Sequence, residues 1–432
     1  MKRAASYALG CKVNQYESEA IAELFAEKGY EIVGIDEAAD VYVINTCTVT
    51  NFGDKKSRQL IRKVKRQNEN AVVAVVGCYA QTAPKEIMEI EGVNLVIGTK
   101  DRGQIVEMVE NYHPEDGVEN HVSDIMKERV FEPLSIQKLA NRTRAYLKIQ
   151  DGCSQYCTYC IIPYARGPIR SREPQDVLQE VRRLAGNGFQ EIVLTGIHVA
   201  SYGKDRKDTG LLDILRQVHG VEGIRRIRFS SIEPNVVTEE FAKAMAELPK
   251  VCHHFHLSLQ SGCDRTLQEM NRKYDTKKYR QAAVLLRKYL PQVALTTDII
   301  VGFPGETEQD FEESYEFAKE IGFAKIHVFP YSPKKGTPAA ERKDQLPNSV
   351  KSERSHKLLA LSDEMSAAFL AQYIGETTEV LYEKKLSEGT YEGHTSNYMK
   401  VHAKSGKDIT NSIVLTKITH VEGENAFGDT NL

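Results

Sequence analysis

The stretch CSQYCTYC at residues 153–160 carries three cysteines, Cys153, Cys157 and Cys160, at the spacing C-x3-C-x2-C. Metal sites built from cysteine usually use four thiolates, so a set of three needs an explanation. Three thiolates can hold a [4Fe–4S] cluster in which one iron has no protein ligand and is open to a small molecule. Zinc and a redox dithiol are the alternatives. Zinc calls for a second C-x-x-C pair, which the sequence does not contain.

The cysteine stretch directly follows an apolar, strand-like segment at residues 145–150. Five further segments of this kind follow, and helical stretches separate them. They lie at residues 191–196, 226–231, 254–259, 294–302 and 325–332. Six βα units predict an α/β domain built as a partial TIM-like (β/α)6 barrel, with active-site groups after the C-terminal ends of the strands. The three cysteines occupy such a position.

The first hundred residues also alternate between strand-like and helix-like segments, which predicts an open parallel α/β sheet covered by helices. The last ~55 residues change to short β-like pieces separated by turn residues, which predicts a small OB-like β-barrel. A charged, proline-containing stretch between the sheet and the barrel domain is expected to be a linker. The predicted boundaries are 1–112 for the N-terminal domain, 113–138 for the linker, 139–370 for the (β/α)6 domain and 371–432 for the β-barrel.

The composition is that of an ordinary globular protein, because 41% of the 432 residues are hydrophobic and 27% are charged. No apolar run approaches the roughly 20 residues that a membrane span needs, so we expect a cytoplasmic protein with no membrane partner. Eight cysteines in a cytosolic chain are not expected to form disulfides and need another role. The net charge of −3 excludes an overall basic field, but residues 55–68 carry seven basic side chains and no acidic one.

A C-x3-C-x2-C motif after the first strand of a (β/α)6 barrel resembles the radical S-adenosylmethionine (SAM) enzymes. The resemblance implies that the open iron of the cluster binds the amino and carboxylate groups of SAM, and that the reduced cluster cleaves SAM to a 5′-deoxyadenosyl radical. It also implies a set of SAM-binding residues at the strand ends. Each alone is equally explained by a turn, a strand-end hydrogen bond or core packing. The set is Tyr159, Gly196, Glu233, Ser258, Gln260 and Gly302.

A second trio, Cys11, Cys47 and Cys78, is spread over the first domain. Each of these cysteines follows a predicted parallel strand, and ligands bind at the carboxyl ends of the strands in open α/β sheets. Gly10 and Gly77 directly precede two of them and leave room for the backbone. A second [4Fe–4S] cluster and a zinc site both fit this arrangement, and three separate buried thiols are the simplest alternative.

Four longer stretches resemble the methylthiotransferases, a family of radical SAM enzymes. They are LGCKVNQYESE at 9–19, VINTCTVTN at 43–51, VVGCYAQ at 75–81 and CSQYCTYCIIPYARGPIRSRE at 153–173. The final segment is similar to the TRAM domain, an RNA-binding β-barrel, so the resemblance covers essentially the whole chain. It implies two [4Fe–4S] clusters, the second of which carries the sulfur, and two SAM molecules. The implied catalytic metal ligands are Cys11, Cys47, Cys78, Cys153, Cys157 and Cys160.

Members of this family act on three substrates, and GCKVNQYES resembles the branch that modifies N6-threonylcarbamoyladenosine in tRNA. The branches differ directly after the first cysteine. The implied reaction inserts a methylthio group at C2 of that nucleoside, 3′ of the anticodon, where the C–H is not acidic enough for an ordinary base. The alternatives are isopentenyladenosine in tRNA and an aspartate of a ribosomal protein. A different class, an iron–sulfur or zinc RNA-binding regulator, would not need the strand-end SAM motifs.

The resemblance further implies that a tRNA anticodon loop is the partner, together with a sulfur donor and an electron donor such as a flavodoxin or ferredoxin system. Basic side chains near the motifs and in residues 55–68 are the predicted phosphate contacts. They are Arg166, Arg170, Arg172, Lys55, Lys56 and Arg58. Residues 375–432 carry six basic and nine acidic groups, which predicts that the C-terminal β-barrel is a weak electrostatic clamp for RNA.

Overall fold

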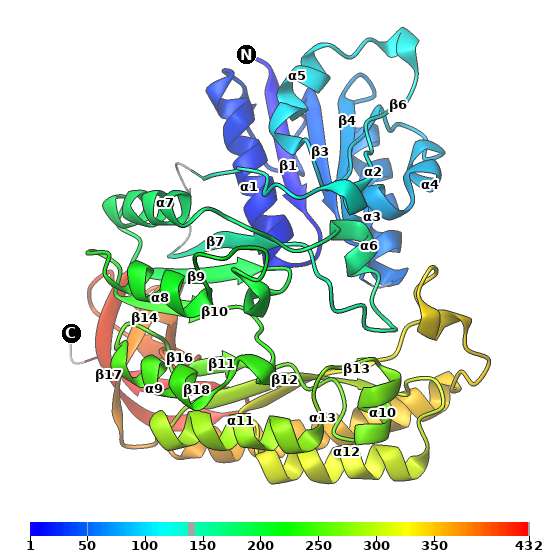
Figure 1. The fold of residues 1–432 in the computed structure, drawn as a ribbon. Coiled ribbons are helices and arrows are strands. Elements are labelled where there is room, and N and C mark those ends of the chain that lie inside the picture. Colours follow the sequence, from blue (N-terminus) through cyan, green and yellow to red (C-terminus); the bar gives the residue numbers. More distant parts are fainter. Residues whose placement is uncertain (50, 137–142, 431–432) are drawn as a thin grey trace.

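The computed structural model describes residues 1–49, 51–136 and 143–430 (Figure 1). In these ranges the N-terminal sheet has six strands in the order β2-β1-β3-β4-β5-β6, and each neighbouring pair is parallel. Its central strands are continuous, β-branched and almost fully buried, as expected for a sheet with helices on both faces. The strands are β1 (Arg3–Ala8), β2 (Glu31–Ile32), β3 (Val41–Thr46), β4 (Val72–Gly77), β5 (Leu95–Val96) and β6 (Glu119–Asn120).

Five helices accompany this sheet in the described residues, so the predicted open parallel α/β sheet is confirmed. They are α1 (Lys12–Glu27), α2 (Asn51–Gln67), α3 (Cys78–Thr82), α4 (Pro84–Met88) and α5 (Ile105–Glu110). Residues 113–138 are more than the predicted linker, because β6 lies within them and extends the sheet at its edge. A strand of two polar residues gives no apolar pattern, so the sequence could not reveal it.

The central region forms an open barrel from two sheets, β10-β9-β7-β8 and β11-β12-β13. Parallel bridges join them, from Ile227 to Val251 and from Ile232 to Leu257. Six strands therefore run parallel around the barrel, as predicted, while β8 is a short antiparallel addition to β7. The strands are β7 (Arg144–Asp151), β8 (Arg170–Ser171), β9 (Glu191–Gly196), β10 (Arg226–Phe229), β11 (His254–His256), β12 (Ala294–Val301) and β13 (Lys325–Pro330).

Helices cover the outside of these strands and bury one large apolar core with them. The helices are α6 (Ile162–Arg166), α7 (Pro174–Gly186), α8 (Leu211–His219), α9 (Glu239–Glu247), α10 (Asp264–Glu269), α11 (Thr276–Tyr289), α12 (Glu308–Ile321) and α13 (Asn348–Ala371). Short 3-10 helices occur at Arg102–Gln104, Pro114–Asp116, Ile125–Lys127, Val199–Ser201, Pro234–Val236 and Pro338–Glu341. None of the helices in the described part of the chain combines the length and the apolar character that a bilayer span requires.

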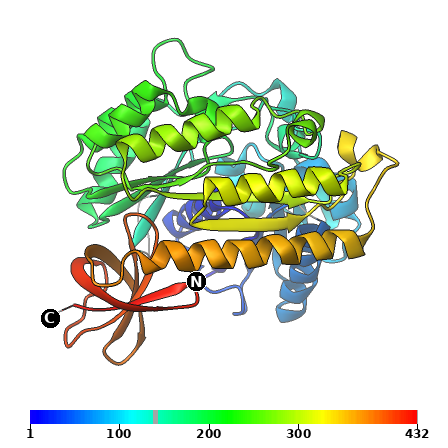
Figure 2. The same cartoon turned by 90° about the horizontal axis from the view of Figure 1, so that it is seen from below.

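The long helix α13 leads into the C-terminal domain, a closed barrel of five strands in the order β14-β15-β16-β18-β17 (Figure 2). The predicted small β-barrel is thus confirmed. Its strands are β14 (Thr377–Ser387), β15 (Thr390–Thr395), β16 (Lys400–Lys404), β17 (Ser412–Glu422) and β18 (Asn425–Asp429). Arginines at the start of β7 and β10 attach it to the central barrel: Arg144 pairs with Glu383 (2.8 Å), and Arg226 donates to the Glu379 carbonyl (2.8 Å).

Candidate active site and two cysteine centres

The loop after β7 carries Cys153, Cys157 and Cys160. Gly152 begins it with a φ of +74°, and a Cβ there would lie 1.8 Å from the carbonyl oxygen of Pro168, so only glycine fits. The Cys160 amide donates to the Cys157 carbonyl (3.0 Å). The strand end and this turn therefore hold the three cysteines in one compact loop, which we call the loop triad.

The thiols of the loop triad lie close enough to influence one another. Burial raises the pKa of Cys153 to about 11 and that of Cys160 to about 12, and repulsion from Cys157 raises both as well. The Arg272 guanidinium donates to the Cys157 sulfur (3.1 Å). A bound metal would release the thiol protons, and Arg272 would stabilise the resulting negative charge. Three neighbouring sulfurs beside a cation fit the ligand set of an iron–sulfur cluster.

Glu233, which follows β10, lies next to the loop triad. Its carboxylate contacts His198 Nε2 (3.1 Å) and the Arg272 guanidinium (2.9 Å). Burial would favour the neutral acid, but the hydrogen bond and charge of His198 and the charge of Arg272 lower the pKa of Glu233. Tyr159 is partly buried, and the charge of Arg272 also acts on its hydroxyl. Arg272 therefore connects two of the predicted SAM-binding residues with the cysteine loop.

The other predicted SAM-binding residues also lie at strand ends, but they differ in how accessible they are to a ligand. Gly196 ends β9 and lines the central cavity described below. Ser258 and Gln260 follow β11 and are partly exposed. Gly302 is buried, and a Cβ at this position would lie 2.4 Å from Cγ of Lys351. The Lys351 side chain therefore fills the space beside Gly302, which leaves no room there for a ligand.

The second trio, Cys11, Cys47 and Cys78, meets at the carboxyl edge of the N-terminal sheet. Cys47 and Cys78 directly follow β3 and β4, and Cys11 follows the adjacent strand β1. Gly10 has a φ of +99°, and a Cβ there would lie 2.7 Å from the Cys47 sulfur. Cys47 thus packs onto the backbone beside Cys11, which only a glycine at position 10 permits. We call this group the strand-end triad.

The thiols of the strand-end triad also influence one another. Burial raises the pKa of Cys47 to about 12, and both Cys78 and Cys11 contribute by charge repulsion. Burial likewise raises the pKa of Cys78, and the positive charge of Arg166 acts in the opposite direction. The Arg166 Nε also donates a hydrogen bond to the Cys78 sulfur (3.2 Å). Cys11, in contrast, is exposed. Three unrelated buried thiols do not describe this group, because Cys11 is exposed and the cysteines follow neighbouring strands, an arrangement that suits an iron–sulfur cluster accessible from the side of Cys11. A single zinc ion needs its ligands closer together, and these sulfurs are not among the described ligand groups whose atoms lie within 4.8 Å of one another.

The predicted contacts of Arg166, Arg170 and Arg172 with RNA are wrong, because all three arginines are buried. Arg166 pairs with Glu17 of α1 (2.5 Å) and Arg172 pairs with Glu180 of α7 (2.5 Å). Arg170 lies 3.7 Å from the Asp151 carboxylate. These ion pairs connect the first domain, the loop after β7 and helix α7. The arginines of this segment therefore form ion pairs in the protein interior and are not displayed on the surface.

Lys55 and Lys56 are exposed on α2 and thus accessible to a phosphate, whereas Arg58 is partly buried. The Arg58 guanidinium donates to the hydroxyl of Tyr79 (2.7 Å), which follows Cys78. Lys55 and Lys56 therefore have the exposure that a phosphate contact requires, and their role in RNA binding stays a prediction. Arg58 is already engaged in a contact within the domain.

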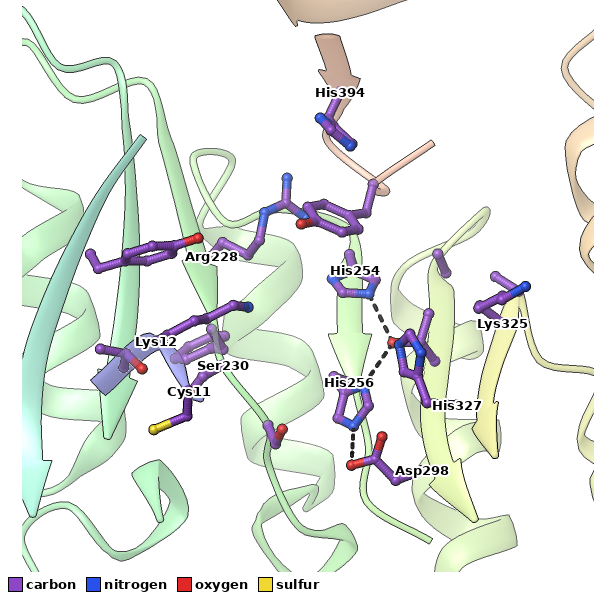
Figure 3. A pocket seen from close by; sticks show the side chains of 18 of the residues that line it. Cys11, Lys12, Arg228, Ser230, His254, His256, Asp298, Lys325, His327 and His394 are labelled. Carbon is purple, nitrogen blue, oxygen red and sulfur yellow. Dashed lines mark hydrogen bonds and ion pairs between the residues drawn. The ribbon is translucent and has the colours of Figure 1, made fainter. Parts of the chain in front are cut away.

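A cavity of about 1000 Å³ runs along the inner face of the open barrel (Figure 3). Cys11 and Lys12 line it from the first domain, Gly196 and Arg228 from the central barrel, and residues 394–400 partly from the C-terminal barrel. Four histidines contribute to its wall: His254, His256, His327 and His394. Among the described residues, Cys11 is the one cysteine of the two triads that borders this cavity. All three domains thus meet around one chamber that reaches the strand-end triad.

Two features of the site were not predicted from the sequence. Arg272 touches Cys157, yet it lies 112 residues beyond the loop and its sequence neighbours RKY carry no metal motif. Tyr398 of the C-terminal barrel adopts a φ of +70° and stacks against His254 (4.9 Å between ring centres) and His394 (4.8 Å). Its positive φ in the turn SNYM is a signal that only the structure shows. Tyr398 lines the cavity as well.

Comparisons with protein families agree with this arrangement. Residues 147–318 match the model of the Radical SAM superfamily, and residues 3–98 match that of Uncharacterized protein family UPF0004. The first match contains the loop triad, and the second contains the whole strand-end triad.

Several curated proteins are similar over nearly the whole chain. Threonylcarbamoyladenosine tRNA methylthiotransferase MtaB of Bacillus subtilis (strain 168) is 48% identical over 97% of this chain and 94% of its own length. The tRNA-2-methylthio-N(6)-dimethylallyladenosine synthase of Clostridium novyi (strain NT) is 37% identical over 97% of this chain and 94% of its length. Among solved structures, the radical S-adenosylmethionine methyltransferase TsrM from Kitasatospora setae has a TM-score of 0.60 at 15% identity, covering 79% of this chain and 77% of that one. This last likeness concerns the fold.

Proposed function

The chain belongs to the radical SAM tRNA methylthiotransferases, and we propose that it inserts a methylthio group at C2 of N6-threonylcarbamoyladenosine, 3′ of the anticodon. The family membership brings with it SAM and a [4Fe–4S] cluster as cofactors and a tRNA substrate. The position of attack, a second cluster and the use of two SAM molecules are parts of the proposal. The observation that carries it is the cavity into which Cys11 of the strand-end triad opens, where all three domains meet.

In this proposal Cys153, Cys157 and Cys160 hold the cluster that works with SAM. When bound, the cluster and SAM supply the radical chemistry that an unactivated C–H bond requires. Arg272 keeps the Cys157 sulfur and the Glu233 carboxylate in fixed positions through its two contacts. Gly196, Glu233, Ser258, Gln260 and Tyr159 are the residues proposed to position SAM at the strand ends.

Cys11, Cys47 and Cys78 hold the second cluster in the proposal, with the sulfur to be transferred on the side of Cys11. Two of these thiols are buried and the third is exposed at the cavity, so a bound group would present one face to the substrate. Arg166 fixes Cys78 from the opposite, buried side by its 3.2 Å contact. The arrangement favours a transfer function for the strand-end triad over a purely structural zinc site, which is normally closed by four protein ligands.

The lining of the cavity favours a charged substituent on the adenosine. It includes Lys12, Arg228, Lys325 and Lys400 together with four histidines, whereas its carboxylates are Asp298 and Glu424 among the described residues. Both carboxylates are already paired, Asp298 with His256 (3.2 Å) and Glu424 with Lys325. A threonylcarbamoyl group carries a carboxylate and fits such a wall. An isopentenyl group is a hydrocarbon that the apolar part of the wall, such as Phe329 and Leu370, can accept but that gives the cations no partner. Relatives that carry a dimethylallyladenosine name keep this alternative in the test.

The tRNA is proposed to approach with its anticodon loop, so that the target base leaves the single-stranded loop and enters the cavity. Lys55 and Lys56 on the exposed face of α2 are proposed phosphate contacts. The C-terminal barrel lines the entrance with Lys400 and Tyr398, and its net acidic charge argues that it contributes shape more than electrostatic attraction. A low-potential electron donor, such as a flavodoxin or ferredoxin, and a sulfur donor complete the proposed reaction.

The decisive experiment is mass spectrometry of nucleosides after reaction. The protein is reconstituted with iron and sulfide without oxygen and is then incubated with reductant, SAM and tRNA that carries N6-threonylcarbamoyladenosine. A methylthio adduct of that nucleoside supports the proposal. Cleavage of SAM without this adduct, but with an adduct on isopentenyladenosine tRNA or on the ribosomal protein, moves the enzyme to another substrate. Absence of both SAM cleavage and adduct would favour an iron–sulfur or zinc RNA-binding regulator.

A further inference from the structure

Lys12 carries a positive charge that no carboxylate in the described residues neutralises. It is the first residue of α1, directly after Cys11, and it is partly buried in the wall of the cavity. Its side chain points across the cavity toward the strand that carries His254 and His256 (Figure 3). No acidic residue lies in the first turn of α1. Lys12 thus faces the cavity without a partner on its own helix.

The charged groups around Lys12 are already paired with one another. The Tyr398 hydroxyl, Arg144, Arg228 and Glu191 all act on it electrostatically, and Glu191 is the one carboxylate among these four. The Glu191 carboxylate, however, accepts a hydrogen bond from Arg228 (2.8 Å), and Arg144 pairs with Glu383 (2.8 Å). Because each neighbouring arginine already has a carboxylate, Lys12 is the surplus cation at this end of the cavity. A partly buried cation without a counter-ion is costly unless a ligand supplies the anion.

The position of Lys12 matches the chemistry of the proposed substrate. In adenine, C2 and the carbon that bears N6 lie on either side of N1, so both face the same edge of the base. A group that delivers sulfur to C2 and a group that binds the N6 substituent must therefore lie close together. Cys11 belongs to the strand-end triad and Lys12 is the next residue.

We propose that Lys12 binds the carboxylate of the threonylcarbamoyl group and so selects this nucleoside over isopentenyladenosine. The inference rests on the proposed function and names the residue that reads the substrate. The ammonium group forms a charge-assisted hydrogen bond with the carboxylate. An isopentenyl group in the same place would leave the lysine buried against hydrocarbon with no partner, which disfavours that substrate.

A cycle of protein and ligand variants tests this contact. The ligands are anticodon stem-loops that carry N6-threonylcarbamoyladenosine, its neutral threonine methyl ester, isopentenyladenosine or unmodified adenosine. Each dissociation constant is measured by fluorescence anisotropy with the cluster-loaded, full-length enzyme under anaerobic conditions. We expect the wild type to bind the acid roughly tenfold to a hundredfold more tightly than the ester, as for a hydrogen bond to a charged group. Lys12→Met should bind acid and ester alike, and Lys12→Arg should restore the preference.

Lys400→Met is the matched control, because Lys400 lines the same cavity but lies near carboxylates of this chain, Glu392 and Glu424, on which its charge acts. Its loss should weaken acid and ester equally and leave their ratio unchanged. The inference is overturned if Lys12→Met keeps the ratio of wild type, or if Lys400→Met removes it. Iron content and the cluster absorbance of each variant show whether the metal centres are intact.

Failure of the inference can be distinguished from failure of the proposed function. If wild type prefers the acid and Lys12→Met does too, the substrate is right and another residue reads it. If wild type binds the acid no better than unmodified adenosine and makes no methylthio adduct on it, the proposed substrate itself is wrong. A gain in affinity of Lys12→Met for the isopentenyl stem-loop, relative to wild type, would support the selective role of Lys12.

Discussion

The loop triad and the strand-end triad each consist of three cysteines, but the chain brings these cysteines together in different ways. Cys153, Cys157 and Cys160 lie on one short loop, whereas the other cysteines come from three strand ends and depend on the order of strands in the sheet. Each triad has one cysteine sulfur that accepts a hydrogen bond from a buried arginine, Arg272 in one case and Arg166 in the other. The loop triad can form from local geometry, while the strand-end triad requires the whole first domain to be folded.

The surroundings of the two triads differ as well. The arginine of the loop triad also contacts Glu233 at a strand end of the central barrel. The arginine of the strand-end triad belongs to a buried ion-pair network around Glu17. Cys11 borders the large cavity, while the cysteines of the loop triad do not line it in the described structure. This difference supports the proposed division, in which the loop triad serves SAM chemistry and the strand-end triad faces the substrate.

The largest effect is expected when the loop triad is broken. Cys157→Ala removes the sulfur that Arg272 contacts and leaves two cysteines for the cluster. SAM cleavage, measured as 5′-deoxyadenosine by chromatography, should fall to the level without enzyme, and no methylthio product should form. Cys252→Ala is the matched control, because Cys252 is buried but belongs to neither triad. Residual cleavage above background in Cys157→Ala would show that the loop is not the SAM centre.

A change in the strand-end triad should separate the two steps. In Cys47→Ala the loop triad is intact, so 5′-deoxyadenosine should form at a rate close to that of wild type. Methylthio product should be absent, and the iron content should fall to that of a single cluster. Product formation by this variant would contradict the assignment of the second cluster, and equal loss of cleavage would contradict the division of roles.

The elements around both triads were largely predictable from the sequence, for a physical reason. Buried parallel strands read as continuous β-branched runs, and each cysteine directly follows such a run or its glycine. The C-x3-C-x2-C spacing is local and visible in the sequence. For the strand-end triad, the sequence places each cysteine at a strand end, but their meeting also depends on β1, β3 and β4 being neighbours, which only the fold establishes.

The sequence misled where long-range pairing decides the environment of a side chain. Arg166, Arg170 and Arg172 lie in a basic stretch that resembles a phosphate-binding surface. Their partners Glu17 and Glu180 are distant in the sequence, so burial of the arginines could not be inferred. The contact of Arg272 with Cys157 and the stacking of aromatic rings across domains escape prediction for the same reason. A local pattern reveals the type of residue but not its neighbours in space.

A moderate effect is expected from the buried ion-pair network around Glu17, whose Arg166 contacts Cys78 of the strand-end triad directly. Glu17 is fully buried and contacts Arg102 (2.6 Å), Arg166 (2.5 Å) and Lys148 (2.7 Å), and these cations hold the pKa of its carboxyl well below the usual range despite burial. Glu17→Gln leaves the cations without one of their carboxylates. We expect a loss of stability of about 3–5 kcal/mol, measured as a lower midpoint of urea unfolding.

The control for this change is Glu308→Gln, since Glu308 is exposed and its partner Arg354 (3.0 Å) keeps the Glu306 carboxylate (2.6 Å) when Glu308 is lost. Its loss should cost at most about 1 kcal/mol. Because Arg166 contacts Cys78, Glu17→Gln should also release iron from the strand-end triad more readily than from the loop triad. Equal stability of the two glutamine variants would show that the buried network does not support the strand-end triad.

The smallest expected effect concerns the two arginine–sulfur contacts themselves. A donor to a ligand sulfur stabilises the more negative, reduced state of a cluster, so its removal should lower the reduction potential. In the Cys47→Ala background only the loop triad should bind a cluster. There, Arg272→Met should shift its potential downward on the order of tens of millivolts, as measured by a redox titration followed by electron paramagnetic resonance. Arg166→Met in the same background removes the contact with Cys78 and should leave this potential unchanged. Equal shifts would mean that the arginines act through general charge, whereas a shift with Arg272→Met alone would show that the loop triad is tuned by its own contact.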